Sequence, residues 1–569
     1  MQHSHGSQHP DVHRRHPETV MKLARIGAFH QSRLSFMRQL LRRMKRENWV
    51  FERPAWTIES TGVGRAVYTA TGPARCYSLV AFAHDLDPSM RSDRVIATAW
   101  DATFTLFDGV PTEADLDRLE ANVPKQEAGR ISSQELCLAR ANRSVRLFDH
   151  VVEALAEGRQ PDMNFVEEVG YLMRTTAVYG SGKFGASDRD RVAEREELSA
   201  PFQAEMLTVF LIRAFTLDLV EHLARTRAPQ SAVAIEPHNR RRFGVGNSTG
   251  LGMAPFLMNH PVLLNNWVMA RETALQRVRS VRVPTPDEID VFRDFVERAA
   301  NDAGHWHSGH ELQVKRIKQL RQDFVLLRDK IAEGLAAEYP WDALYRWSES
   351  TLSLEGQEQL VSLLLEPYGA LVDELGDTMR ADEQSAFPIH GEMKIAALRD
   401  ILDTHGQWVS EIDFAEERNR ALFWYVSEEK LEPRIGQRFT EPGQELEQPL
   451  AVARDVYLLQ EALKSAGGNE TVAAFLLRHP EHRHIVRRVQ LAPQYPYADI
   501  QDNLIGQEML PIDLLRCKLS FFGAIRFDPR SDRWVRINMY KNAPFPHELD
   551  RHPADDWSYP RLTQQEQKS

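Results

Sequence analysis

The most apolar helical segment of the chain reads Met206-Leu207-Thr208-Val209-Phe210-Leu211-Ile212-Arg213-Ala214-Phe215-Thr216-Leu217, and Arg213 is its only charged residue. A helix that is apolar on nearly every side is buried on every side, so the pattern over 200–225 predicts the central helix of the fold. A buried guanidinium needs a carboxylate, carbonyl groups or an anionic ligand. Arg213 is therefore either a structural partner, for example of Glu205, or a ligand for an anion.

Strand-like segments lie on both sides of a long helical middle. Alternating patterns rich in β-branched and aromatic residues at 65–71, 76–83 and 94–105 predict a small antiparallel meander. Near the C-terminus, 518–527 and 534–540 predict a hairpin whose turn contains Pro and Asp. The sequence alone does not show whether the two sets of strands share one sheet, although economy of exposed surface favours it.

Strands and helices do not alternate along the chain, which argues against a doubly wound sheet or a barrel. The predicted class is α+β, a mainly helical body with small antiparallel β elements contributed by the N- and C-terminal regions. The predicted helices cover 133–157, 163–175, 200–225, 251–282, 287–303, 310–338, 351–375, 392–405 and 451–466.

The N-terminal region combines a His-rich leader, expected to be disordered, with a basic amphipathic helix. The basic face is interpreted as a solvated face docked on an acidic body, with a nucleic-acid or lipid surface as the alternative. The expected regions are the leader (1–18), the basic helix (19–50), a small β region (51–125), a helical region with two Gly/Ser-rich loops (126–285), a second helical region (286–510), a C-terminal β hairpin (511–550) and a tail (551–569).

Composition describes an ordinary globular chain of 569 residues with a formal net charge of −11. That charge argues against a protein that coats nucleic acid or an anionic membrane. The three cysteines contain no CxxC pair, which excludes a dense disulfide framework and suits a reducing compartment. No apolar run approaches the roughly 20 residues that span a bilayer. A cytoplasmic location without membrane partners is expected, and association into a homo-oligomer stays open.

Anion-binding chemistry is indicated by the segment Arg240-Arg241-Arg242-Phe243-Gly244-Val245-Gly246-Asn247-Ser248-Thr249-Gly250-Leu251-Gly252-Met253. Glycines let a ligand approach the backbone, amides at a helix start carry partial positive charge, and arginines add forked donors. A second segment, Tyr179 to Arg189, repeats the combination of small residues, hydroxyls and cations. We expect the two segments to face a common cleft; the alternative is that both are Gly-rich helix connections.

In this hypothesis the anion is a phosphate- or carboxylate-bearing metabolite. Lys183, Arg241 and Arg242 neutralise its charge, and His260 or Tyr179 moves a proton. The expected ligand-binding residues are Ser181, Lys183, Arg189, Arg213, Arg241, Arg242, Asn247, Ser248, Thr249 and Gly250.

Known catalytic motifs match these loops only in part. The P-loop spacing is absent, and the pair Tyr179 and Lys183 lacks the dinucleotide-binding unit that a YxxxK dehydrogenase needs. The segment 246–250 matches the GxSxG nucleophile elbow, which makes a serine hydrolase with Ser248 as nucleophile the main alternative. The residues before it are too basic, and too poor in branched apolar side chains, for a buried parallel strand.

Histidines supply further candidates. Pro261 is expected to kink or interrupt the helix that starts near Leu251, and His260 beside it is either an acid-base group or a partner for freed helix carbonyls. His305, His307 and His310 are weak metal candidates, weaker still is the cluster at 479–484, and no metal is expected.

The sequence therefore predicts a non-redox enzyme of the lyase or transferase type that holds a small anionic metabolite between the two Gly/Ser-rich segments. No motif identifies a cofactor, which stays unknown. The remaining alternative is a non-catalytic scaffold that binds nucleic acid or protein through its basic N-terminal helix.

Overall fold

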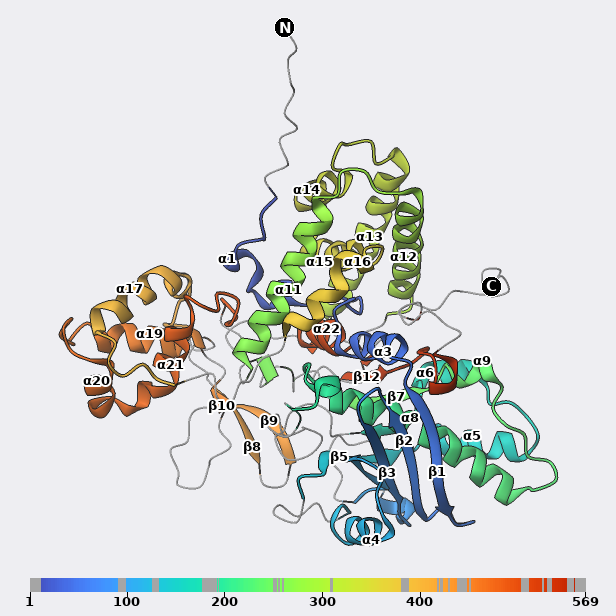
Figure 1. The fold of residues 1–569 in the computed structure, drawn as a ribbon. Helices are drawn as coiled ribbons and strands as arrows, with labels where there is room; N and C mark the ends of the chain where they lie inside the picture. Colours follow the sequence, from blue (N-terminus) through green and yellow to red (C-terminus); the bar gives the residue numbers. More distant parts are fainter. Residues whose placement is uncertain are drawn as a thin grey trace.

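Figure 1 shows a large twisted sheet around a long helix, a body of helices beside it, and a smaller helical group at the left. The computed structural model describes residues 12–90, 99–124, 132–175, 192, 194–248, 253, 256–257, 260–306, 311–379, 388–416, 419, 423–427, 430–436, 448–449, 452–502, 511–523, 526–529, 535–549 and 557.

One mixed sheet of nine strands has the order β1-β2-β3-β4-β5-β6-β7-β12-β11. Its neighbours pair antiparallel, except for the parallel pair β6 and β7. The N-terminal and C-terminal strands therefore share one sheet. The strands are β1 (Val50–Ile58), β2 (Gly64–Thr71), β3 (Cys76–Ala83), β4 (Ala102–Asp108), β5 (Glu135–Arg143), β6 (Tyr171–Thr175), β7 (Gly244–Ser248), β11 (Arg526–Pro529) and β12 (Val535–Met539).

Helix α8 (Gln203–Arg227) covers one face of this sheet and is the predicted central helix. It contacts strands β2 to β7 on one side and helices α3 (Phe36–Arg46) and α5 (Phe148–Ala156) on others. Phe215 illustrates the packing, because its ring meets the ring of Phe104 at a centroid distance of 5.5 Å. Apolar side chains are needed all round α8 because protein surrounds it.

The opposite face of the sheet is covered over β2 to β4 by the short helix α4 (Glu113–Asn122). Leu116 and Leu119 of α4 are buried in a separate apolar cluster with Val80 and Phe82 of β3. The central strands are thus buried on both faces.

A helical body lies beside the sheet, with α22 and α3 between the two (Figure 1). The smaller group at the left contains helices and a three-stranded sheet in the order β10-β8-β9. The body contains α11 (Pro261–Arg279), α12 (Pro286–Gly304), α13 (Glu311–Glu333), α14 (Pro340–Thr351), α15 (Leu354–Leu364), α16 (Gly369–Val372), the 3₁₀ segment η3 (Asp373–Met379) and α22 (Pro511–Phe522). The smaller group contains α17 (Ile395–His405), α19 (Val452–Leu463), α20 (Val472–Arg478), α21 (Arg483–Leu491), β8 (Phe423–Ser427), β9 (Lys430–Gly436) and β10 (Gln448–Pro449).

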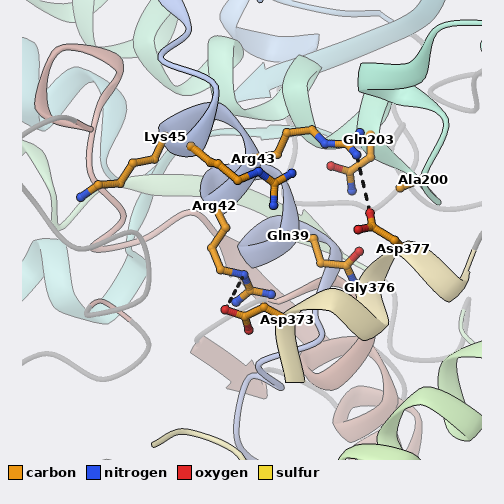
Figure 2. A pocket seen from close by; sticks show the side chains of 10 residues that line it. Gln39, Arg42, Arg43, Lys45, Ala200, Gln203, Asp373, Gly376 and Asp377 are labelled. Carbon is orange, nitrogen blue, oxygen red and sulfur yellow. Dashed lines mark ion pairs between the residues drawn. The ribbon is translucent and has the colours of Figure 1, made fainter. Parts of the chain in front are cut away.

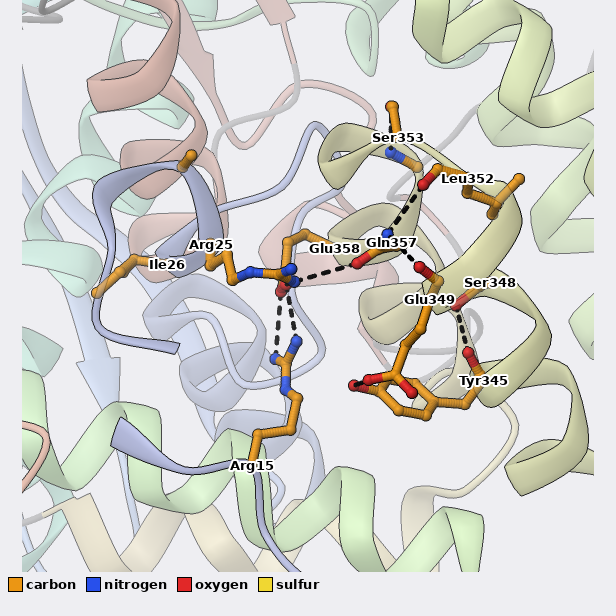
Figure 3. Close-up of polar contacts among 12 residues, drawn as sticks. Arg15, Arg25, Ile26, Tyr345, Ser348, Glu349, Leu352, Ser353, Gln357 and Glu358 are labelled. Atoms are coloured by element: carbon orange, nitrogen blue, oxygen red, sulfur yellow. Dashed lines mark hydrogen bonds and ion pairs between the residues drawn. The ribbon is translucent and has the colours of Figure 1, made fainter. Parts of the chain in front are cut away.

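The N-terminal segment is folded from residue 12, which corrects the expectation of a disordered leader over residues 1–18. Val12 is 6% exposed and Arg15 is 8% exposed. Nε of Arg15 donates to Glu272 at 2.8 Å, and its Nη1 donates to Glu358 at 2.7 Å. Figure 3 shows Arg15 and Arg25, from different parts of this segment, converging on Glu358 of α15. The segment is therefore attached to the helical body by buried ion pairs.

The basic helix expected over residues 19–50 is three short helices followed by the start of β1. The longest of them, α3, is docked on acidic residues, and part of its basic face is not solvated. Arg38 is 0% exposed and pairs with Glu366 at 2.7 Å, while Arg43 is buried as well. These arginines are part of the interior. The first two helices are α1 (Pro17–Val20) and α2 (Leu23–Ile26).

The expected fold class is wrong, because the β structure is one large mixed sheet and not small elements from the two ends of the chain. Strands β5, β6 and β7 come from the region predicted to be helical, 126–285. In β5 the run Glu135 to Ala139 is buried at every position. A strand buried on both faces loses the alternating pattern, so periodicity does not distinguish it from a buried helix.

Two further boundaries differ from expectation. Residues 518–522, expected as strand, are the end of helix α22, and only the segments around 526–529 and 535–539 form the hairpin. Helix α11 begins at Pro261, where the missing N–H costs nothing, whereas a helix was expected to start near Leu251 and to be kinked or interrupted at this proline. Within the described part of the chain, none of the helices combines the length and apolar character needed to cross a bilayer.

Candidate functional site

Strands β6 and β7, each of which precedes glycines of one Gly/Ser-rich segment, end at the same edge of the sheet. The two strands run parallel, and Thr175 at the end of β6 is paired with Asn247 in β7. The chain leaves β6 toward residues 176–191 and leaves β7 toward residues 249–259. Ligands of sheets with parallel strands bind at the carboxyl ends of those strands. Thr175 and Asn247 therefore lie side by side at an edge of this kind.

A buried lysine from a distant part of the sequence reaches this edge. Nζ of Lys518, on α22, donates to Oδ1 of Asn247 at 2.6 Å. Nδ2 of Asn247 in turn donates to the backbone carbonyl of Thr175 at 3.1 Å. The second bond fixes the carboxamide so that its oxygen faces the amine. We call Thr175, Asn247 and Lys518 the strand-end site.

The environment of Lys518 changes its acid-base behaviour. Lys518 is 1% exposed, and burial lowers the pKa of its amine well below the usual range. Loss of water disfavours the ammonium form, so a larger share of the side chain is a neutral amine near neutral pH. A neutral amine can accept a proton, which an ordinary surface lysine cannot do at this pH.

An aromatic cluster adjoins the strand-end site and contains His260. Phe522 lies one helical turn after Lys518 on α22, and its ring centroid is 5.2 Å from that of Phe256. The His260 ring lies 5.0 Å from Phe256 and 6.2 Å from Phe202, again between centroids. Asn247 and Phe256 thus each lie close to a residue of α22, Lys518 and Phe522 respectively. His260 follows as the residue that precedes α11.

Arg241 and Arg242 do not belong to the strand-end site. They precede β7, whereas Asn247 is near its end, and a strand of five residues spans about 17 Å. Nε of Arg241 donates to Glu548 at 3.0 Å, and Nη1 of Arg242 donates to Glu167 at 3.4 Å. The expectation that these arginines neutralise the ligand of the Gly/Ser-rich segments is corrected by this placement. Strand β7 thus separates these arginines from Asn247, although they are close in sequence.

Arg213 binds backbone carbonyls. Its guanidinium donates to the carbonyls of Phe243 at 2.6 Å, Ala543 at 2.9 Å and Arg241 at 3.1 Å. The same group lies 3.9 Å over the ring of Phe545. Burial lowers the pKa of Arg213 to about 9. These contacts connect α8 to the segments before β7 and after β12, which is the structural role considered for this residue and not the anion-ligand role.

Several expected site residues lie outside the described part of the chain. Ser248 is the last residue of β7, and only its backbone is described. The residues that lie outside are Tyr179, Ser181, Lys183, Arg189, Thr249 and Gly250. Their roles remain predictions.

The histidine clusters show no metal centre among the described residues. His305 follows the end of α12, and its Nδ1 lies 2.9 Å from the carbonyl oxygen of Asn301. His307 and His310 lie outside the description. In the second cluster, His479 and His482 pack against the ring of Phe475.

Sequence reasoning missed Lys518. Lys518 was expected at the start of a strand. Side chains alternate between the two faces of a strand, so a charged residue there is expected to face solvent. The available signal was its setting, because the segment 514–522 reads Leu-Leu-Arg-Cys-Lys-Leu-Ser-Phe-Phe, a largely apolar helix with charged residues inside it. The same argument was applied to Arg213 and applies equally here.

Comparison of the chain with protein-family models, with curated proteins and with solved structures gave no match in any of the three.

Proposed function

We propose that this protein is an enzyme that binds a small phosphate- or carboxylate-bearing metabolite at the strand-end site and carries out acid-base chemistry of the lyase or transferase type. The observation that carries the proposal is the hydrogen-bonded series from Lys518 to Asn247 to Thr175, at the carboxyl ends of two parallel strands that precede glycines of the two Gly/Ser-rich segments. Buried titratable groups with displaced pKa values are concentrated at functional sites.

The chemistry follows from the neutral amine. Lys518 accepts a proton from the substrate, and the ammonium that forms is paired with the negative charge of the bound metabolite. Asn247 accepts a hydrogen bond from Lys518 in both protonation states, so the amine keeps its orientation during the transfer. Backbone amides of the glycine-rich segments are suited to hold the anion. His260, beside the same aromatic cluster, is the candidate for a second proton transfer.

The proposal includes a cytoplasmic location. Cys76, Cys137 and Cys517 are all free, and the last two are buried. Free cysteines suit a reducing compartment.

Replacement of Lys518 by methionine separates function from stability. Methionine removes the cost of burying an amine but leaves the buried Oδ1 of Asn247 without this donor, so the two effects oppose each other and we expect only a small change in stability. We expect the rise in melting temperature on addition of inorganic phosphate to be smaller in this variant than in the parent protein, because the strand-end site no longer binds phosphate. A bound ligand at a hundred times its Kd stabilises the parent by about 2.7 kcal/mol.

The matched control is Lys464→Met, which removes an exposed lysine and should leave phosphate binding unchanged. Equal stabilisation of the parent and the Lys518→Met variant by phosphate would refute the proposed role of Lys518.

A serine hydrolase is the second candidate, and one observation favours it. Residues 244–248 do form a parallel strand that ends at Ser248, which is the element that a nucleophile elbow requires and that the sequence did not indicate. Labelling by a fluorophosphonate probe that disappears in Ser248→Ala would establish this alternative. The scaffold alternative has lost support, because Arg38 and Arg43 of α3 are buried.

A further inference from the structure

A basic cavity lies at the surface between α3, η3 and the start of α8 (Figure 2). Its volume is about 310 Å³, at the lower end of the range for small-molecule sites. Four cations from α3 and two carboxylates from η3 line it, so the cavity carries a surplus of positive charge. The charged lining residues are Arg42, Arg43, Lys45, Arg46, Asp373 and Asp377.

Backbone carbonyls hold the two central arginines in position. Nη1 of Arg43 donates to the carbonyls of Glu196 at 2.8 Å and Glu197 at 2.9 Å. Nη2 of Arg42 donates to the carbonyl of Arg33 at 2.7 Å. Both guanidinium groups are therefore oriented without a bound anion, and less conformational entropy is lost when an anion arrives.

The carboxylates of the cavity are only loosely paired with these arginines. Nε of Arg42 lies 3.7 Å from Asp373, and Nη2 of Arg43 lies 3.7 Å from Asp377. Figure 2 shows both arginines reaching from α3 toward these aspartates. Contacts of this length are longer than charge-assisted hydrogen bonds, which measure 2.7–2.9 Å. A phosphate group that forms short, forked bonds to the arginines would bind them more strongly than the aspartates do.

We propose that this cavity, the α3 cavity, binds a small phosphorylated molecule that carries at least two negative charges. The surplus of cations and the forked donors of Arg42 and Arg43 favour a phosphate over a single carboxylate. Among the described residues of the lining there is no aromatic side chain on which a nucleobase would stack, which favours a phosphorylated sugar or acid over a nucleotide. None of its residues belongs to the strand-end site, so the site is separate from that of the proposed reaction.

The test uses inorganic pyrophosphate as the probe and isothermal titration calorimetry of the full chain. The Lys518→Met variant is the background, so that the strand-end site does not contribute. In this background we expect one pyrophosphate to bind per chain. Addition of Lys45→Gln and Arg46→Gln should weaken that binding about tenfold or more, because two of the four cations are lost.

Lys45 and Arg46 are not buried, so their replacement should leave the fold intact. The matched control is the pair Lys315→Gln and Lys318→Gln on the exposed face of α13, which makes the same change in net charge. Weaker binding with the first pair alone supports the α3 cavity. Equal weakening by both pairs shows a general charge effect, and unchanged binding with the first pair places the pyrophosphate elsewhere; either result overturns the proposal.

Pyrophosphate binding to the parent chain also separates this inference from the proposed function. If the α3 cavity is correct and the strand-end site is not, Lys518→Met leaves the stoichiometry at one. If only the strand-end site binds pyrophosphate, Lys518→Met abolishes binding and the α3 variants do not affect it.

Discussion

Replacement of Glu366 by leucine is expected to destabilise the protein by about 3–5 kcal/mol, the cost of breaking a buried ion pair from one side. The two carboxylate oxygens of Glu366 accept hydrogen bonds from Arg38, both at 2.7 Å. Nε2 of His30 lies 2.6 Å from the same carboxylate. All three side chains are 0% exposed, so leucine would leave the guanidinium of Arg38 buried without the carboxylate of Glu366. Urea-induced unfolding measures the loss.

The matched control is Glu374→Leu, since Glu374 is exposed and pairs with the partly exposed Arg277. Because exposed ion pairs contribute little to stability, we expect Glu374→Leu to change the free energy of unfolding only slightly. Equal effects of the two replacements would contradict the account of the buried pair.

The Glu366 pair also predicts how stability depends on pH. Burial opposes ionisation of Glu366, but Arg38 and His30 outweigh it and hold the pKa of the carboxyl well below its usual value of 4.5. A carboxyl with a lowered pKa in the folded state stabilises fully above its unfolded pKa, and this stabilisation is lost as the pH falls below it. The parent protein should therefore lose stability below about pH 4.5 more steeply than Glu366→Leu does.

Replacement of Arg213 by methionine is expected to cost about 3 kcal/mol or more. The carbonyls of Phe243 and Ala543 lose this donor, whereas the carbonyl of Arg241 still accepts from the backbone N–H of Asn542 at 2.7 Å. Each buried carbonyl left without a partner costs about 1–3 kcal/mol. Methionine keeps an apolar contact with Phe545, so lost packing adds little. The free energy of unfolding measures the effect, with the more exposed Arg225→Met of the same helix as control.

The Arg213 variant discriminates between two interpretations of a buried arginine. If Arg213 has a structural role, its replacement lowers the stability of the protein with or without a ligand. If its role is to bind an anion, its replacement leaves the stability of the ligand-free protein nearly unchanged. Unaltered stability of Arg213→Met in the absence of ligand would restore the anion-ligand hypothesis for this residue.

Some of this fold follows from local pattern and some does not. Helix α8 was predictable because an apolar surface on every side has one explanation, burial on every side. Strands β2 and β3 were predictable from residue type and spacing, but β5, which is buried on both faces, resembled a helix. The parallel pairing of β6 with β7 depends on contacts between distant segments that no local pattern encodes.

The same limit applies to the candidate site. Asn247 was predicted to lie in it, but its partner Lys518 is 271 residues away in sequence. The arginines of 240–242 were assigned to the site because they adjoin the glycine-rich segment, yet strand β7 places them at the other end. The charge pattern of the N-terminal region shows that it is rich in arginines. It does not reveal that Arg15 and Arg38 are buried in ion pairs with Glu358 and Glu366.

The proposed function requires an anion to bind where β6 and β7 end. Tungstate, a tetrahedral dianion with strong anomalous scattering, can be located directly by soaking crystals of the protein and recording anomalous diffraction. We predict a peak beside Asn247 and Lys518, at the carboxyl ends of the two parallel strands. Tungstate bound only in the α3 cavity, or nowhere near Asn247, would contradict the central claim.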